Sequence, residues 1–169
     1  TSFYTIQNNG TATLEDVTAT AGNTGSSMLD NAGTLTINSG SYTGGMNTVK
    51  NEPNATLTIN GGTFTNDYSE YNANTAVVYN LGAVTINDGE FDHNATYAMW
   101  HYPHVIMTTS ENNVVPSTII KGGNFVSKTT FWLAYIINHA NTSESCTQVS
   151  GGTFNKKVNE EYCADGYIP

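Results

Sequence analysis

Apolar and polar residues alternate with a period of two in an eight-residue segment that recurs along the chain. The clear copies are LTINSGSY at 35–42, LTINGGTF at 57–64, VTINDGEF at 84–91, TIIKGGNF at 118–125 and TQVSGGTF at 147–154, with ATLEDVTA at 12–19 as a degenerate first copy. Alternation in short segments rich in Thr, Ile, Val and aromatic residues is typical of β-strands and argues against helical repeats. The pattern therefore predicts six copies of a strand-rich unit.

The third residues of successive copies are 23, 22, 27, 34 and 29 residues apart. Intervals of this size suit the coils of a solenoid joined by loops of variable length. A single coil cannot bury its apolar face alone, so neighbouring coils that carry the same residues must cover it. Glycines are expected at the tight corner between two strands of each coil, at Gly40, Gly62, Gly89, Gly123 and Gly152.

A second, shorter series lies between these segments. It consists of TIQN at 5–8, MLDN at 28–31, TVKN at 48–51, VVYN at 77–80, AMWH at 98–101 and YIIN at 135–138. In stacked coils, one Asn at the same bend of each coil can bond to the Asn above and below, and Asn tolerates left-handed turns. We therefore predict an internal ladder formed by Asn8, Asn31, Asn51, Asn80, His101 and Asn138.

Together the two series predict an all-β fold, a right-handed parallel β-helix of about six coils that forms a single domain over residues 1–169. The coils are expected at about 1–31, 32–51, 52–80, 81–117, 118–145 and 146–157, with a C-terminal cap at 158–169. Like residues should stack in columns inside it. The aromatic column is Tyr42, Phe64, Phe91, Phe125 and Phe154, and the column on the strand before the ladder is Leu29, Val49, Val78, Met99 and Ile136.

The segments INGGTF and VSGGTF, and above all the ending GGTFNKKVNEEYCADGYIP at 151–169, resemble β-helical repeat proteins of gut bacteria. Those proteins are often described as adhesin-like and have a pectate-lyase-like fold. As a fold, the resemblance covers nearly the whole chain, whereas its specific part is the last nineteen residues. It implies a secreted or surface-displayed module closed by residues 162–167. Similar segments also occur in viral fibres and decoration proteins.

The composition and net charge of the chain mainly exclude classes of binding partner. Charged residues make up 11% of the chain and its net charge is −9, so nucleic acid and anionic membranes would be repelled. The surface positions are dominated by hydroxyl and amide side chains instead. No apolar run is long enough to span a membrane, and no cofactor is expected. The composition favours an extracellular, cell-surface or virion-surface location.

The two cysteines, Cys146 and Cys163, lie close together in the last quarter of the chain. Because the composition is of an extracellular kind, we predict a disulfide between them, which would stabilise the fold by roughly 3 kcal/mol. Two free buried thiols are the alternative.

Candidate chemistry is sparse. The densest acidic set is Asp88, Glu90 and Asp92, a candidate for weak calcium binding, with a solvated polar face as the simpler interpretation. All five basic residues are Lys, so no Arg is present to bind a uronate carboxylate through two hydrogen bonds. The histidine pair in HYPH at 101–104 does not predict a metal site. We therefore expect no catalytic residues and no bound metal.

The outward side of the strand before the ladder changes from polar to apolar along the chain. In the later coils it is expected to present an apolar and aromatic stripe of Val77, Tyr79, Ala98, Trp100, Leu133, Tyr135 and Ile137. An apolar patch of this kind indicates that another segment or molecule lies over it. The candidates are the segment at 102–117, another protein subunit, or a glycan stacked on the aromatic rings.

These features predict a non-enzymatic structural or adhesive module that displays this stripe to a subunit or partner. Two alternatives remain. One is a small β-helix that binds or degrades carbohydrate, and the other is a self-assembling subunit of a filament or capsid. We also expect the N-terminal coil, whose strand edges are open, to pair with further sequence or another subunit.

Overall fold

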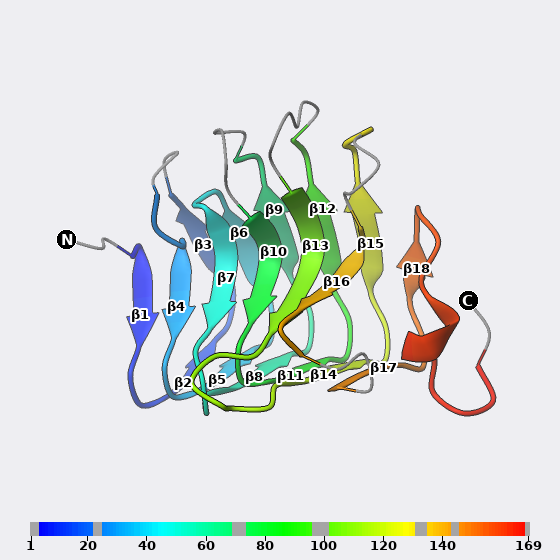
Figure 1. Cartoon of the computed structure of the whole chain (residues 1–169). Coiled ribbons are helices and arrows are strands. Elements are labelled where there is room, and N and C mark those ends of the chain that lie inside the picture. Colours follow the sequence, from blue (N-terminus) through cyan, green and yellow to red (C-terminus); the bar gives the residue numbers. More distant parts are fainter. Residues whose placement is uncertain are drawn as a thin grey trace.

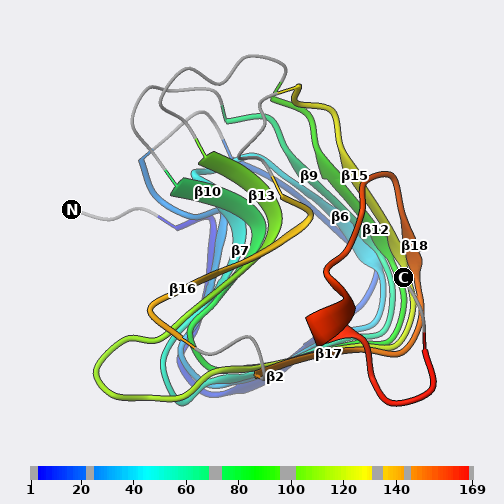
Figure 2. The same cartoon turned by 45° about the vertical axis from the view of Figure 1, so that its right-hand side comes forward.

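The computed structural model describes residues 4–21, 25–68, 74–95, 102–130, 135–142 and 146–167. Its strands form three parallel sheets of six strands each, which together enclose one elongated core, the shaft (Figures 1 and 2). Every repeat contributes one strand to each sheet, so that strands 20 to 40 residues apart in the chain lie side by side. The chain is thus a parallel β-helix, which confirms the fold predicted from the sequence.

Sheet A contains the strands that lead into the Asn bend. They are β1 (Ile6–Asn8), β4 (Leu29–Asn31), β7 (Asn47–Asn51), β10 (Asn74–Asn80), β13 (Tyr102–Thr109) and β16 (Ile137–Ala140). Sheet B contains the first half of each repeated segment: β2 (Thr11–Leu14), β5 (Thr34–Ile37), β8 (Thr56–Ile59), β11 (Ala83–Ile86), β14 (Ser117–Ile120) and β17 (Thr147–Val149).

Sheet C contains the second half of each segment. Its strands are β3 (Val17–Thr20), β6 (Gly40–Thr43), β9 (Thr63–Asn66), β12 (Glu90–His93), β15 (Asn124–Ser127) and β18 (Thr153–Phe154). Glycine makes the corner between sheets B and C, as predicted. Gly89 has φ +133°, and a Cβ there would lie 3.1 Å from the carbonyl oxygen of Gly62.

The interior is filled by the predicted columns of like residues. The aromatic rings from Tyr42 to Phe154 stack with centroids 4.8 to 5.0 Å apart and planes within 9° of parallel. Leu35, Leu57 and Val84 pair in register in sheet B, and all three are buried. The spacing of the rings equals the distance between neighbouring strands, so the backbone ladder sets the ring stack.

The first four predicted ladder residues are joined directly by hydrogen bonds. The Nδ2 of Asn8 donates to Asn31 Oδ1 at 2.7 Å, Asn31 donates to Asn51 at 2.8 Å, and Asn51 donates to Asn80 at 2.9 Å. Each amide also bonds to backbone carbonyl oxygens at the bend, as Asn51 does to Ala83 at 3.1 Å. The ladder therefore satisfies side-chain and backbone groups that are buried together.

In β13 and β16, the last two strands of sheet A, the ladder prediction was wrong. Asn80 pairs in register with Thr108, and Thr108 pairs with His139, so Thr108 and His139 hold the positions assigned to His101 and Asn138. The cause in β13 is that this strand uses the apolar run after Pro103, which places Val105 and Ile106 in the core. His101 and Met99 lie outside the described residues.

The error in β16 is a shift of one residue. Ile136 and Ile137 are both buried, and the register pairs Ile137, not Ile136, with Ile106. A shift of one residue exchanges the two faces of a strand, so Asn138 leaves the ladder. Its Nδ2 lies 3.1 Å from Nε2 of His104 instead.

The ends of the sheet C strands form a second column of buried polar residues, which the sequence analysis missed. Asn66, His93 and Ser127 pair in register and are buried. Thr75 Oγ1 lies 3.1 Å from Nε2 of His93, and Asn66 Nδ2 donates to the carbonyl oxygen of Ala76 at 3.3 Å. These contacts connect sheet C to sheet A at the corner between them.

The C-terminal end of the shaft is closed by a short cap. It contains the 3-10 helix η2 (Glu160–Tyr162), drawn in red at the end of the shaft in Figure 2. Val158 and Tyr162 are buried, and the Tyr162 ring contacts that of His139 at 4.7 Å between centroids. At the opposite end, β1, β2 and β3 are edge strands, and the core residues Ile6, Leu14 and Val17 are only partly buried.

Candidate functional site

The outward face of sheet A brings four polar or aromatic residues from successive coils into one row. The parallel register pairs Gln7 with Asp30, Asp30 with Lys50, and Lys50 with Tyr79. The row exists because every coil places the residue before its ladder position on the outside of the sheet. Its members are therefore neighbours although about 70 residues of chain separate the first from the last.

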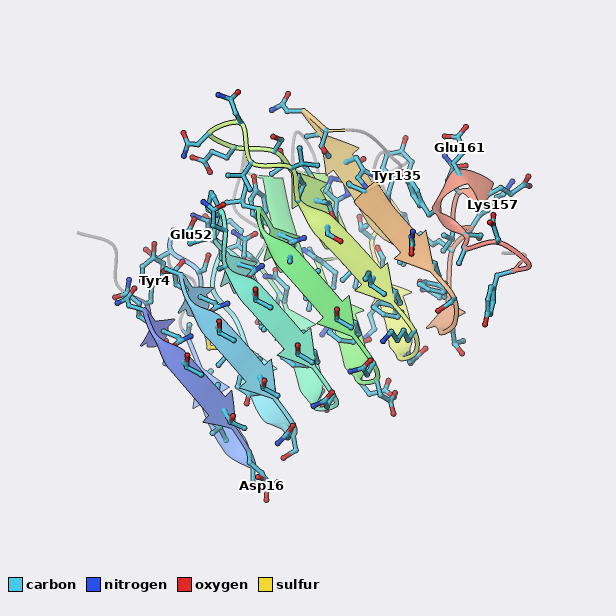
Figure 3. The ribbon with its side chains drawn as sticks, turned by 90° about the horizontal axis from the view of Figure 1, so that it is seen from below. Tyr4, Asp16, Glu52, Tyr135, Lys157 and Glu161 are labelled. Carbon is cyan, nitrogen blue, oxygen red and sulfur yellow. The ribbon has the colours of Figure 1, made fainter. Side chains whose placement is uncertain are left out.

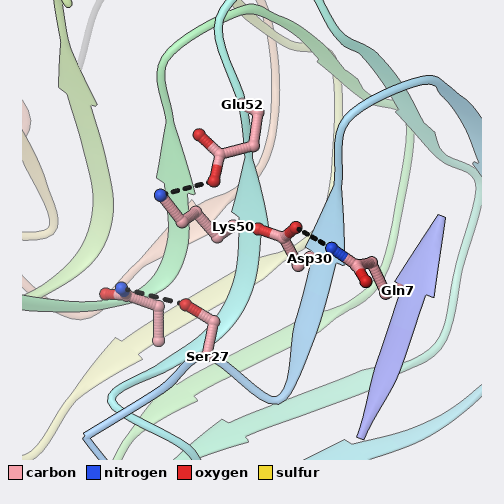
Figure 4. Close-up of polar contacts among 6 residues, drawn as sticks. Gln7, Ser27, Asp30, Lys50 and Glu52 are labelled. Atoms are coloured by element: carbon pink, nitrogen blue, oxygen red, sulfur yellow. Dashed lines mark hydrogen bonds and ion pairs between the residues drawn. The ribbon is translucent and has the colours of Figure 1, made fainter. Parts of the chain in front are cut away.

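Hydrogen bonds link this row to Glu52, which follows the bend of the third coil (Figure 4). Lys50 Nζ donates to Glu52 Oε1 at 2.5 Å, and Gln7 Nε2 donates to Asp30 Oδ2 at 3.4 Å. Asp30 is only 3% exposed, and its Oδ1 has no hydrogen-bond partner. Two carboxyl groups and one ammonium thus meet on adjacent coils.

The surroundings shift the proton affinities of these groups. Burial, together with the neighbouring carboxylate of Glu52, raises the pKa of Asp30 from 3.8 to about 6, although Gln7 and Lys50 act in the opposite direction. Burial alone would lower the pKa of Lys50, but the hydrogen bond and charge of Glu52 outweigh it, so the pKa is raised. Burial also raises the pKa of Tyr79.

A cavity of about 250 Å³ opens beside this row. Its lining residues include the aromatic Tyr4 and Tyr79 and the charged Lys50 and Glu111. Asn47, which donates to Ser27 Oγ at 3.4 Å, adds an amide. In Figure 3, which views the molecule from below, Tyr4 and Glu52 lie at the end of the molecule away from the cap residues Lys157 and Glu161.

This combination suits the recognition of a small polar ring. Aromatic rings offer flat apolar faces, while ammonium, carboxylate and amide groups donate and accept hydrogen bonds at the edge. A sugar presents both kinds of surface, since its C–H groups stack on tyrosine and its hydroxyls bond to polar side chains. Asp30 does not line the cavity, because Gln7, Lys50 and Glu52 surround it.

The predicted apolar stripe does not form as a continuous surface. Val77 is fully buried in the core, and Ile137 is 5% exposed and belongs to the core as well. Both were assigned to the outward face. The one-residue shift of β16 turns Ile137 inward, whereas β10 keeps the expected pairing of Val78 with Val49 and Val77 is nevertheless buried beside it. Tyr79 is partly exposed and lines the cavity, and Tyr135 is 45% exposed. Ala98, Trp100 and Leu133 lie outside the described residues.

The predicted covering segment at 102–117 also differs from expectation. Most of it is strand β13, in which Val105, Ile106 and Met107 are buried, rather than a loop that folds over the surface. Only residues 110–116 form a loop, held by a bridge between Glu111 and Val114. Glu111 from this loop reaches the cavity beside Tyr79.

The candidate calcium ligands are spread along one corner and strand. Asp88 is exposed and its Oδ1 accepts from the backbone N–H of Gly89 at 2.8 Å. Glu90 Oε2 accepts from Asn124 Nδ2 at 2.8 Å, and Asp92 is partly exposed on the same face of β12. Within the described ranges, no group of three or more His, Cys, Asp or Glu side chains is placed to hold a metal ion.

The predicted disulfide is absent, and both cysteines are free thiols. Cys163 pairs with Val149, which lies three residues beyond Cys146 along the same strand direction. At about 3.3 Å per residue, this separation is roughly 10 Å, longer than a disulfide can bridge. The cap therefore packs against the last coil with Cys163 displaced from Cys146.

No helix in the described part of the chain is long and apolar enough to cross a membrane. Comparisons with protein-family models, with curated proteins and with solved structures find no match to this chain.

Proposed function

We propose that this protein is a non-enzymatic structural and adhesive β-helix module of an extracellular, cell-surface or virion-surface assembly, and that it binds a glycan through the outward face of sheet A. The observation that carries the proposal is the cavity in which Tyr4 and Tyr79 lie beside Lys50 and Glu111. The hydroxyl- and amide-rich composition and the resemblance of residues 151–169 to adhesin-like repeat proteins support it.

The glycan is expected to be neutral. The chain carries a net charge of −9, and Glu52 already pairs with Lys50, the ammonium at the cavity wall. A polyanionic sugar would meet repulsion from Glu111 and from the molecule as a whole. Neutral hexoses supply the C–H faces and hydroxyl edges that the cavity suits, without that cost.

Binding can be tested by titrating the full chain with neutral and uronate-containing oligosaccharides in a calorimeter. Tyr79→Leu removes one stacking face and should weaken binding about fivefold, since a stacking contact contributes roughly 1 kcal/mol. Tyr167→Leu is the matched control, because Tyr167 is 54% exposed at the opposite end of the molecule. Equal loss in both variants, or no heat with any neutral glycan, would reject the proposal.

Polysaccharide cleavage is a second candidate, favoured by one observation. Asp30 and Glu52 are carboxyl groups on adjacent coils, and the pKa of Asp30 is raised to about 6, as acid–base catalysis requires. However, Asp30 is 3% exposed, so a substrate cannot contact it in this structure. Release of reducing ends from neutral or uronate polysaccharides, lost in Asp30→Asn, would establish this activity in place of simple adhesion.

Self-assembly is the third candidate, and its basis is the N-terminal end of the shaft. The strands β1, β2 and β3 each have one unpaired edge, and the core residues beside them are partly exposed. Open strand edges pair readily with another chain. Light scattering should then show association that increases with protein concentration, whereas a monomer at all micromolar concentrations and above would exclude assembly through this end.

A further inference from the structure

The aromatic column does not end against the cap but beside a cavity. Phe154 is the last ring of the stack, lies 4.9 Å from Phe125 and is partly exposed. A cavity of about 760 Å³ opens between the last coil and the C-terminal cap, and Phe154 forms part of its wall. The lining includes Val149 of sheet B and Phe154 of sheet C, and Val158 of the cap forms part of the opposite wall.

The walls of this cavity are apolar and aromatic on one side. Val149 and Val158 line it together with the rings of Phe154 and Tyr167. The stack from Tyr42 onward has nearly parallel planes at a constant spacing, and Phe154, its last ring, lines the cavity, so a flat ring bound against Phe154 would extend the column. A planar group placed there would contact Phe154 as each ring contacts the one before it.

The charged groups at the cavity have one sign. Lys156 and Lys157 are two of the five basic residues of a chain with net charge −9, and no acidic residue is among the lining. Lys156 Nζ donates to the carbonyl oxygen of Thr129 at 2.8 Å, which positions its ammonium beside the last coil. The side chain of Lys157 is 79% exposed and lies 3.9 Å from Glu160. An anion is therefore favoured here although the rest of the molecule repels it.

From the open ring, the volume and the local positive charge, we propose that this cavity binds a small planar aromatic carboxylate. The ring stacks on Phe154 between the valines and Tyr167, and the carboxylate lies toward Lys156 and Lys157. The site is at the opposite end of the molecule from the sheet A cavity and is independent of glycan binding.

Cys163 provides a direct readout, because it is among the residues that line the cavity whereas Cys146, also a partly exposed free cysteine, is not. Benzoate should slow alkylation of Cys163 by iodoacetamide in the full chain, with half-protection at about 1 mM, and leave Cys146 unaffected. Cyclohexanecarboxylate has the same charge without a planar ring and should protect about tenfold less well. Mass spectrometry of the two cysteine peptides measures both rates.

Two variants test separately the contributions of the Phe154 ring and of the Lys157 charge to binding. Phe154→Leu should weaken protection by benzoate about tenfold. Lys157→Gln, at an exposed side chain that leaves the fold intact, should weaken benzoate but not uncharged benzyl alcohol. Equal protection of both cysteines, equal protection by the planar and non-planar acids, or unchanged protection in Lys157→Gln would overturn the proposal. If Phe154→Leu unfolds the last coil, the comparison of probes and Lys157→Gln still decide the question.

Discussion

The hydroxyl groups of Thr108 and Thr118 lie 2.8 Å apart inside the shaft, at the point where the Asn ladder ends. Asn80, the last amide of the ladder, donates to Thr118 Oγ1 at 3.0 Å. In earlier coils the position of Thr118 is an aliphatic residue, Leu57 or Val84. The loss of an amide at 108 is therefore accompanied by a hydroxyl on the neighbouring column, which keeps the buried polar atoms paired.

This relationship predicts energetic coupling between the two threonines. Thr108→Val and Thr118→Val should each lower the free energy of unfolding by about 1–2 kcal/mol, because each leaves a buried hydroxyl or amide with one bond fewer. The double variant should lose about 1 kcal/mol less than the sum of the two. Denaturant unfolding of the four proteins measures the coupling, and strict additivity would show that the hydroxyls do not interact.

Substitution of a buried asparagine in the middle of the ladder should destabilise the protein more than substitution of an exposed asparagine outside it. Asn51 bonds to both Asn31 and Asn80 and is fully buried, so Asn51→Ala should destabilise the protein by about 2–4 kcal/mol. The exposed amides of Asn38 and Asn60 form a similar bond at 2.9 Å, yet Asn60→Ala should cost less than about 0.5 kcal/mol. Urea midpoints compare the two, and equal losses would contradict this account.

The ring stack provides a third prediction. Phe91 is fully buried between Phe64 and Phe125, so Phe91→Leu should lower the free energy of unfolding by about 1–3 kcal/mol through lost stacking and imperfect packing. Tyr42→Phe keeps the ring and removes only the hydroxyl, which donates to the Ser39 carbonyl oxygen at 3.0 Å. Its effect should be about 1 kcal/mol. Thermal unfolding would refute the ordering if Tyr42→Phe were the more damaging.

Asp30 should make stability depend on pH. Its pKa is raised in the folded state from 3.8 to about 6, so between these values the folded protein holds more protons than the unfolded chain. Stability is therefore lost as pH rises through this window, by at most about 3 kcal/mol. The amide side chain of Asp30→Asn cannot titrate, so this loss is absent from the variant. The unfolding free energy of the variant minus that of wild type should therefore increase from pH 4 to pH 7.

The matched control for this pH profile is Asn60→Ala. Asn60 is exposed and has no titratable group, so the difference in unfolding free energy between this variant and wild type should be the same at every pH in this range. A flat difference for Asp30→Asn would show that its carboxyl titrates as it does in the unfolded chain.

The site near Asp30 could be predicted only in part. Gln7, Asp30 and Lys50 occupy equivalent outward positions, which the alternation in the sequence indicates. The pairing of Lys50 with Glu52 depends on how the chain bends after the ladder, and the reach of Glu111 depends on a loop 60 residues later. Repetition specifies positions within a coil, but it carries no information about contacts made by residues outside the repeat.

The sequence by itself determined the repeat, the parallel stacking, the internal columns and the first four rungs of the ladder, because identical side chains one coil apart are forced into register. Only the tertiary structure decided which residues form β13, the one-residue shift in β16 and the separation of the two thiols. In those two strands several apolar residues are adjacent, as at Ile136 and Ile137, so the alternation in the sequence fits two registers. The choice between them then falls to the neighbouring coil, whose contacts are not written in the local pattern.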